Sequence, residues 1–141
     1  MIVVDTSVIY ALLDRRDALH AHALAWYQKV DEDLATTPMV LAEADHLATA
    51  RAGPVAARAF RRDVRVGAYV LEWWPDAPAQ CAEIAERYEG LGIGLTDASL
   101  VALADRLETV RIATFDERHF RAVRPLSGGQ AFVLLPSDAR S

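Results

Sequence analysis

The chain has 141 residues, of which 52% are hydrophobic, and its 15 basic and 20 acidic side chains leave a formal net charge of −5. This length suits one domain with a core of its own, and the apolar fraction excludes an intrinsically disordered chain. The negative balance argues against a passive nucleic-acid coat, but it is compatible with an enzyme that acts on nucleic acid. No apolar run is long enough to cross a bilayer, so no membrane partner is expected.

The amino terminus reads MIVVDTSVIYALL and lacks the basic leader and cleavage site of a signal peptide. The single cysteine, Cys81, cannot form an internal disulfide and falls on the apolar face of a predicted helix, where a packed thiol is expected. A reducing compartment suits such a thiol. These features predict a cytoplasmic protein.

Strand-like and helix-like patterns alternate along the chain, which favours an α/β fold with a mostly parallel sheet covered by helices. Strands are expected at residues 2–4, 34–36, 69–71, 110–114 and 131–135. Helices are expected near 8–13, 18–30, 38–48, 54–66, 76–88 and 96–107, with a short turn at 117–120. Thr37, Asp76 and Thr96 are the predicted N-caps. One domain is expected to span residues 1–141, with a frayed polar tail from about residue 136.

Three acidic residues occupy the ends of predicted elements: Asp5 ends the first strand, Asp97 opens a helix, and Asp116 follows a later strand. Two of them have an ordinary explanation: Asp97 could serve only the helix dipole in the first turn, and Asp116 could be only a turn residue or a cap. Parallel strands that feed helices nevertheless bring such ends to one edge of the sheet. Glu43 lies inside a helix and close to its apolar face, where an unpaired carboxylate needs a partner.

Several converging carboxylates without basic partners repel one another, and a hard divalent cation relieves this repulsion. Oxygen-only ligands suit Mg²⁺ or Mn²⁺. Such a cation activates water and stabilises charge at a phosphoryl centre, which favours phosphodiester hydrolysis. The acids therefore indicate a metal-dependent hydrolase.

With these residues in place, the sequence resembles the PIN-domain ribonucleases and, within them, the VapC toxins of bacterial toxin–antitoxin pairs. The resemblance runs from residue 2 to about residue 135. It is carried by VVDTSVIYALL around Asp5, a mid-helix Glu43, LTDASLVALA around Asp97, and ATFDERHF around Asp116. The motifs are short, but their ordered set of four is fairly specific.

The resemblance implies a three-layer α/β/α fold and a Mg²⁺-dependent endoribonuclease toxin. It implies that Asp5, Glu43, Asp97 and Asp116 bind the metal and carry catalysis. Thr6 or Ser7, together with Thr114, would support these acids by hydrogen bonding. It also implies RNA as substrate, a homodimer, and inhibition by a small VapB-like antitoxin.

Three other functions fit parts of the pattern. An aspartate phosphatase would use Asp5 as nucleophile, but it normally has a second Asp two residues on, where this chain has Ser7. A phospho-receiver domain needs a lysine near the end of the sheet, whereas Lys29 is the only lysine and lies early in the chain. A non-catalytic RNA-binding module would bind RNA without cutting it.

Four arginines recur at helical spacing and predict one basic helix face: Arg58, Arg61, Arg62 and Arg65. This face is either a phosphate-binding surface for RNA, a contact for an acidic partner, or simply solvated. His20 and His22 point about 200° apart on a helix and are not expected to share a metal.

Other aromatic and histidine side chains also invite a functional interpretation. His46 and His119 lie near Glu43 and Asp116 in sequence, yet structural or solvated roles are favoured. The pair Trp73-Trp74 is expected to pack in the core or in a dimer interface.

Overall fold

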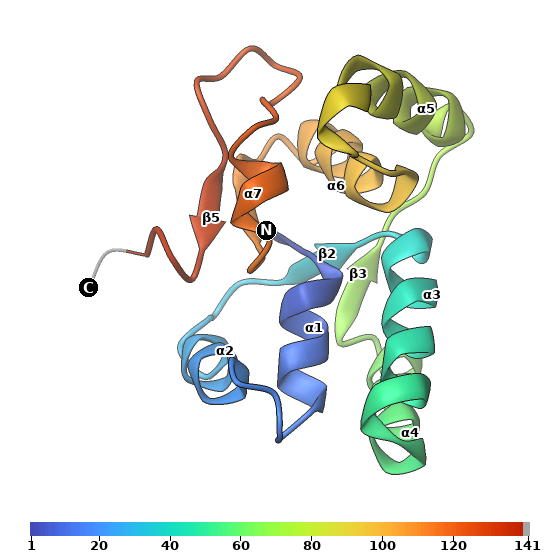
Figure 1. Ribbon diagram of the computed structural model, residues 1–141, viewed down its shortest axis with the longest axis vertical. Helices are drawn as coiled ribbons and strands as arrows, with labels where there is room; N and C mark the ends of the chain where they lie inside the picture. The colour runs from blue at the N-terminus through green and yellow to red at the C-terminus, as the bar shows by residue number, and fades with distance from the viewer. Residues whose placement is uncertain (140–141) are drawn as a thin grey trace.

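The computed structural model describes residues 1–139 (Figure 1). Five strands form one sheet in the order β3-β2-β1-β4-β5, and all four adjacent pairs are parallel. The strands are β1 (Ile2–Val4), β2 (Leu34–Thr36), β3 (Tyr69–Leu71), β4 (Arg111–Ala113) and β5 (Val133–Leu135). The α/β fold expected from the sequence is confirmed, and within the described residues the sheet is entirely parallel.

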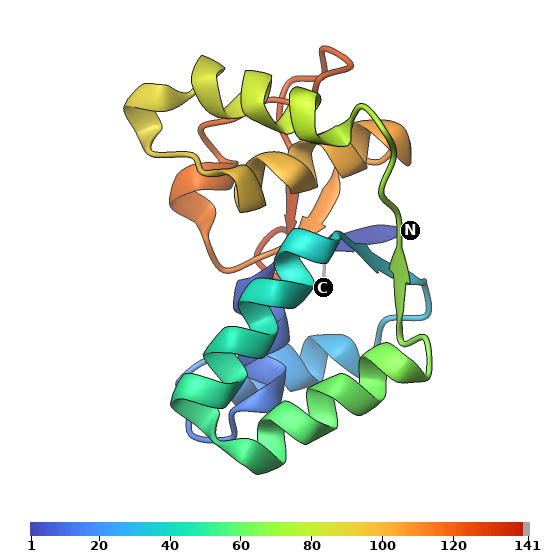
Figure 2. The ribbon, with the colours of Figure 1, turned by 90° about the vertical axis from the view of Figure 1, so that its right-hand side faces the viewer.

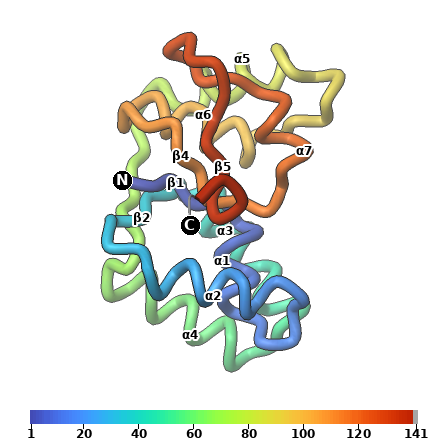
Figure 3. Tube along the Cα trace, turned by 90° about the vertical axis from the view of Figure 1, so that its left-hand side faces the viewer, coloured from blue at the N-terminus to red at the C-terminus, as the bar shows by residue number. Residues whose placement is uncertain are grey.

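Helices cover both faces of the sheet. They are α1 (Thr6–Leu13), α2 (His20–Tyr27), α3 (Pro38–Leu47), α4 (Pro54–Arg65), α5 (Ala77–Arg87), α6 (Leu95–Arg106) and α7 (Glu117–Phe120). A π-helix (Ala48–Ala52) continues α3, and a 3₁₀ turn (Glu89–Leu91) follows α5. Figure 2 shows the strands between the α5–α6 pair on one side and helices α1 to α4 on the other. Figure 3 shows the same separation from the opposite side.

The core lies where the short central strands meet α6. Val3, Val4 and Ile112 are fully buried, as expected for parallel strands that are covered on both faces. Every residue of α6 from Ala98 to Ala104 is also buried, because α5 covers the side of α6 that faces away from the sheet. The position of α6 is therefore set by packing on two sides. Cys81, on α5, is buried in this core as predicted.

The predicted helix starts are only partly correct. Thr37 caps α3, because its Oγ1 accepts a hydrogen bond from the amide of Val40 at 3.3 Å. Asp76 occupies the N-cap position of α5 but makes no side-chain capping bond. The N-cap expected at Thr96 is wrong: α6 begins at Leu95, after Gly94 in an extended conformation. Thr96 instead lies in the first turn, where its carbonyl accepts a hydrogen bond from Ser99.

The polar segment after β5 is held to the fold rather than frayed at its start. Asp138 accepts a hydrogen bond from the amide of Leu134 at 2.8 Å and pairs with the guanidinium of Arg121 at 2.8 Å. The final residues of the predicted tail, 140 and 141, lie outside the described part of the chain. Among residues 1–139, no helix has the length and hydropathy needed to cross a membrane.

Candidate metal and active site

The order in which strands are added to the sheet reverses between β1 and β4. The chain moves from β1 to β2 on one side and later returns to place β4 on the other side of β1. In open parallel sheets, the carboxyl ends of strands at such a switch point form a crevice that binds ligands. Asp5 follows β1 and Thr114 follows β4, so both side chains lie at this point. The parallel topology therefore places the first acid at the expected edge.

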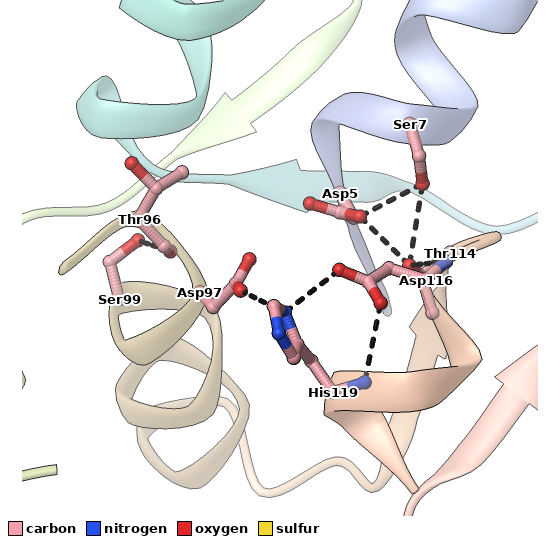
Figure 4. Close-up of polar contacts among 8 residues, drawn as sticks. All are labelled: Asp5, Ser7, Thr96, Asp97, Ser99, Thr114, Asp116 and His119. Atoms are coloured by element: carbon pink, nitrogen blue, oxygen red, sulfur yellow. Dashed lines mark hydrogen bonds and ion pairs between the residues drawn. The ribbon is translucent and has the colours of Figure 1, made fainter. Parts of the chain in front are cut away.

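Hydroxyl groups surround the carboxylate of Asp5, which is 4% exposed. Ser7 and Thr114 each donate a hydrogen bond to its Oδ2 at 2.8 Å (Figure 4). The amide of Phe115 donates to Ser7 Oγ, and the amide of Asp116 donates to Thr114 Oγ1. These bonds fix Asp5 and tie the turn after β4 to the start of α1. The resemblance offered Thr6 or Ser7 as the supporting hydroxyl, and in the structure Ser7 makes the bond to Asp5.

Asp97 and Asp116 meet through the imidazole of His119. His119 Nδ1 lies 2.9 Å from Asp97 Oδ2 and 3.0 Å from Asp116 Oδ2 (Figure 4). One ligand atom from each of the three side chains falls within 4.8 Å of the others, a spacing that one metal ion can bridge. Asp116 also caps α7 by accepting a hydrogen bond from the His119 amide at 3.2 Å. The capping interpretation of Asp116 is thus correct, and it is compatible with a role in the site.

A buried pair of hydroxyls joins the starts of α3 and α6. Thr37 Oγ1 lies 2.8 Å from Ser99 Oγ, which in turn donates to the carbonyl of Thr96 at 2.6 Å. Glu43 belongs to α3 and Asp97 belongs to α6. The pair therefore sets the positions of two helices that each carry one of the predicted acids. Nothing in the spacing of Thr37 and Ser99 along the sequence pointed to this contact.

Glu43 lies differently from the prediction. Its side chain, on α3, is exposed to solvent rather than close to the buried face of the helix. It nevertheless lines the same cavity of about 320 Å³ as Asp5, Asp97 and Asp116. The structure therefore brings all four predicted acids to one cavity. The expectation that Glu43 is buried and needs a partner for that reason is wrong.

Burial and mutual repulsion disfavour negative charge in this hollow. Desolvation is the main cause that raises the pKa of Asp5, partly offset by the hydrogen bonds from Thr114 and Ser7. The pKa of Asp97 is raised to about 6, first by desolvation and then by the charge of Asp5. The free protein therefore holds these carboxylates at an energetic cost that a cation would remove.

Comparisons with known proteins agree with this geometry. The PIN-domain family profile matches residues 2–125. Ribonuclease VapC26 of Mycobacterium tuberculosis is 37% identical over 135 residues, which cover 95% of this chain and 99% of the relative. The chain belongs to the PIN-domain family of VapC ribonucleases.

A solved structure of the same family shares the fold. The crystal structure of M. tuberculosis VapC20, described as a sarcin–ricin-loop-cleaving toxin, superposes with a TM-score of 0.76 at 26% sequence identity. The match covers 83% of this chain and 91% of VapC20. PIN nucleases use a divalent metal. The side chains of the cavity must therefore offer ligand atoms that such a cation can bind.

One buried hydroxyl supports that fit. Thr6 lines the acidic cavity and is only 3% exposed, and its buried Oγ1 has no hydrogen-bond partner within residues 1–139. A buried hydroxyl without a partner costs free energy unless a ligand or water satisfies it. The site also offers carboxylate oxygens and the imidazole nitrogen of His119, a donor set that suits a hard divalent cation. The residues present therefore fit a metal ion in this cavity.

The remaining predicted side chains have mixed outcomes. His20 and His22 have separate surroundings: His20 Nδ1 contacts the carbonyl of Ala11, and the His22 ring packs near Phe115. Core packing is confirmed for Trp74, which is buried with its indole N–H bonded to Gln80. Trp73 is 39% exposed, so for this residue the interface alternative stays a prediction.

His46 and His119, for which structural or solvated roles were favoured, have different surroundings. His46 is exposed on α3. His119 contacts both Asp97 and Asp116. Its spacing of three residues from Asp116, at the start of a helix, could have identified it in the sequence as part of the site.

Asp97→Asn is expected to raise the thermal stability of the metal-free protein at neutral pH. The folded-state pKa of Asp97, about 6, lies above its usual value of 3.8, so protonation favours folding. That stability is fully present below about pH 4 and is lost as the pH rises through 6. An amide avoids this loss, so the variant should gain on the order of 2 kcal/mol near pH 7.5 and little near pH 4.

Melting temperatures in EDTA between pH 4 and pH 8 measure this difference. Asp105→Asn, at an exposed position on the same helix, is the matched control and should follow the wild-type profile. If Asp97→Asn melts below wild type throughout this range, Asp97 acts only on the helix dipole, where an acid is worth up to about 1 kcal/mol.

Proposed function

We propose that this chain is a Mg²⁺- or Mn²⁺-dependent endoribonuclease that acts as a toxin. Asp5, Glu43, Asp97 and Asp116 would hold the metal and carry catalysis, with Ser7, Thr114 and Thr6 in support. The observation that carries the proposal is the convergence of these four acids, from four separate elements, on one cavity of about 320 Å³. The family membership supplies the substrate class, RNA.

The roles of the residues follow from their surroundings. Ser7 and Thr114 hold Asp5 in one orientation, which keeps an oxygen directed toward the cavity. His119 holds Asp97 and Asp116 close together in the free protein. A divalent cation bound there would act as a Lewis acid toward a phosphodiester. Because burial leaves Asp5 and Asp97 poorly solvated, their attraction for a cation is stronger than it would be at the surface.

Cleavage of RNA by the purified protein tests the proposal. A synthetic sarcin–ricin-loop hairpin is the first substrate to try, because the structural relative VapC20 is described as cleaving that loop. We expect discrete products with Mg²⁺ or Mn²⁺, no products in EDTA, and recovery when the metal is restored in excess. Binding without cleavage under all metal conditions would instead establish an RNA-binding module.

A phosphatase with Asp5 as nucleophile is disfavoured by the structure. Such enzymes have a second Asp two residues after the nucleophile, whereas this chain has Ser7 there, with its hydroxyl bonded to Asp5. Hydrolysis of p-nitrophenyl phosphate that is lost in Asp5→Asn, together with intact RNA, would favour the phosphatase.

A VapB-like antitoxin and a homodimer complete the proposal, on the basis of family membership. Exposed apolar side chains are available for such contacts, including Trp73 beside β3 and Leu95 at the start of α6. Light scattering on the isolated chain tests the dimer, and a monomer at micromolar concentration would exclude it.

The arginine face of α4 remains a proposed RNA contact, but without Arg61. Arg61 makes a two-bond pair with Asp45 on α3, at 2.7 and 3.2 Å, so it is less available for phosphate. Arg58, Arg62 and Arg65 are exposed on the same helix. Replacing these three by Gln should weaken RNA binding and lower its salt slope by roughly 0.7 for each phosphate that is no longer bound. An unchanged slope would identify a solvated or partner-binding face.

A further inference from the structure

One basic side chain lines the same cavity as the acids of the candidate site. Of the described residues that line the cavity, Arg51 alone is basic. Within residues 1–139 its guanidinium forms no ion pair, and its backbone carbonyl rather than its side chain accepts the contact from Arg16, at 3.2 Å. An arginine without a partner carries five free N–H donors in a planar fork that matches phosphate oxygens.

The π-helix determines where Arg51 points. Glu43, Leu47 and Arg51 follow one another at intervals of four residues, and all three line the cavity. On a regular α-helix, eight residues at about 100° each would turn Arg51 about 80° away from Glu43. The wider turn of the π-helix (Ala48–Ala52) reduces this rotation and returns Arg51 to the side of Glu43. Such π-segments are rare and occur frequently at functional sites.

Arg51 lies at a different end of the cavity from the proposed metal ligands. Eight residues from Glu43 to Arg51 correspond to about 12 Å along the helix axis. On the facing helix α1, Tyr10 lies one turn beyond Thr6 and also lines the cavity. The pKa of Tyr10 is raised, mainly by its hydrogen bond to Asp14, and the nearby positive charge of Arg51 opposes part of that rise. α1 packs against both α3 and the π-helix, so these two side chains share one end of the hollow.

We propose that Arg51 binds a backbone phosphate of the RNA next to the scissile one, and so positions the strand across the acids. The inference rests on the proposed ribonuclease function. The two parts of the cavity would have different roles: Asp5, Asp97 and Asp116 would hold a cation that supplies Lewis-acid chemistry, and Arg51 would bind the neighbouring phosphate directly. Without such a cation, RNA entering a cavity lined mainly by carboxylates would meet net repulsion.

RNA binding by Arg51→Gln tests the inference. In the cleavage-deficient Asp97→Asn background, fluorescence anisotropy with a labelled single-stranded RNA and Mg²⁺ gives Kd at several salt concentrations. Removal of one charge-assisted bond to phosphate should weaken binding roughly tenfold and lower the salt slope by about 0.7. Arg51→Lys keeps the charge but loses the fork, so its slope should stay near wild type while its Kd is intermediate.

Arg87→Gln is the matched control, because Arg87 is an exposed arginine in the last turn of α5 and does not line the cavity. It should leave both Kd and slope unchanged. In the active protein, Arg51→Gln should raise KM more than it lowers kcat, since the contact is made outside the reacting bond.

Two outcomes would overturn the inference in distinguishable ways. If the wild-type chain binds and cleaves RNA while Arg51→Gln has the same Kd and slope, Arg51 makes no phosphate contact and the ribonuclease proposal stands. Loss of antitoxin binding in that variant would then assign Arg51 to the protein partner. If the wild-type chain neither binds nor cleaves RNA, the ribonuclease proposal fails together with this inference.

Discussion

Asp97→Asn is expected to cleave RNA roughly a thousandfold more slowly than the wild-type chain, because the proposed metal-assisted step, worth several kcal/mol, would lose one of its proposed charged ligands. The amide has nearly the same shape, so the contact with His119 and the first turn of α6 should survive. The same substitution should raise the stability of the metal-free protein. Slow cleavage combined with higher stability would separate a functional carboxylate from a structural one.

Initial rates with saturating Mn²⁺ measure this effect. Asp105→Asn serves again as the control, because it removes one carboxylate from an exposed position of the same helix. Its rate should lie within a factor of two or so of wild type, since surface charges contribute little. Undiminished cleavage by Asp97→Asn would exclude Asp97 from the active site.

Thr114→Val is expected to lower activity or metal affinity by roughly 10- to 100-fold, as for other residues that orient metal ligands. The Thr114 hydroxyl donates to Asp5 Oδ2 and accepts the amide of Asp116, so its loss frees two acids at once. It also leaves buried polar groups unsatisfied, at a cost of about 1–3 kcal/mol in the free energy of unfolding. Metal titration by calorimetry and steady-state cleavage measure the two parts.

Thr36→Val separates orientation of the acids from loss of stability. Thr36 is also a fully buried threonine of the sheet, and its hydroxyl donates to the carbonyl of Val4 rather than to an acid. Its replacement should cost similar stability while the folded protein keeps its activity. Thr114→Ser, which keeps the hydroxyl, should recover most of the activity. Equal activity in the two valine variants would mean that Thr114 serves the fold alone.

The sequence alone predicted the elements and the location of three acids. Every strand appears where β-branched and apolar runs placed it, because buried parallel strands have a composition that differs from their surroundings. Asp5, Asp97 and Asp116 were recognisable because they adjoin the ends of elements, and such ends meet in a parallel sheet. Local rules were less reliable for detail: Thr96 suits an N-cap, but Gly94 already adopts the extended conformation that starts α6.

Contacts between distant segments were decided only by the tertiary structure. The bond from Thr114 to Asp5 joins residues 109 positions apart, and the Thr37–Ser99 pair joins residues 62 positions apart. No local pattern encodes such contacts, since they depend on the order β2-β1-β4 and on how α3 and α6 pack. The direction of Arg51 was hidden for a related reason. Helical periodicity describes a uniform helix, whereas a five-residue π-helix changes the rotation and brings Arg51 to the cavity.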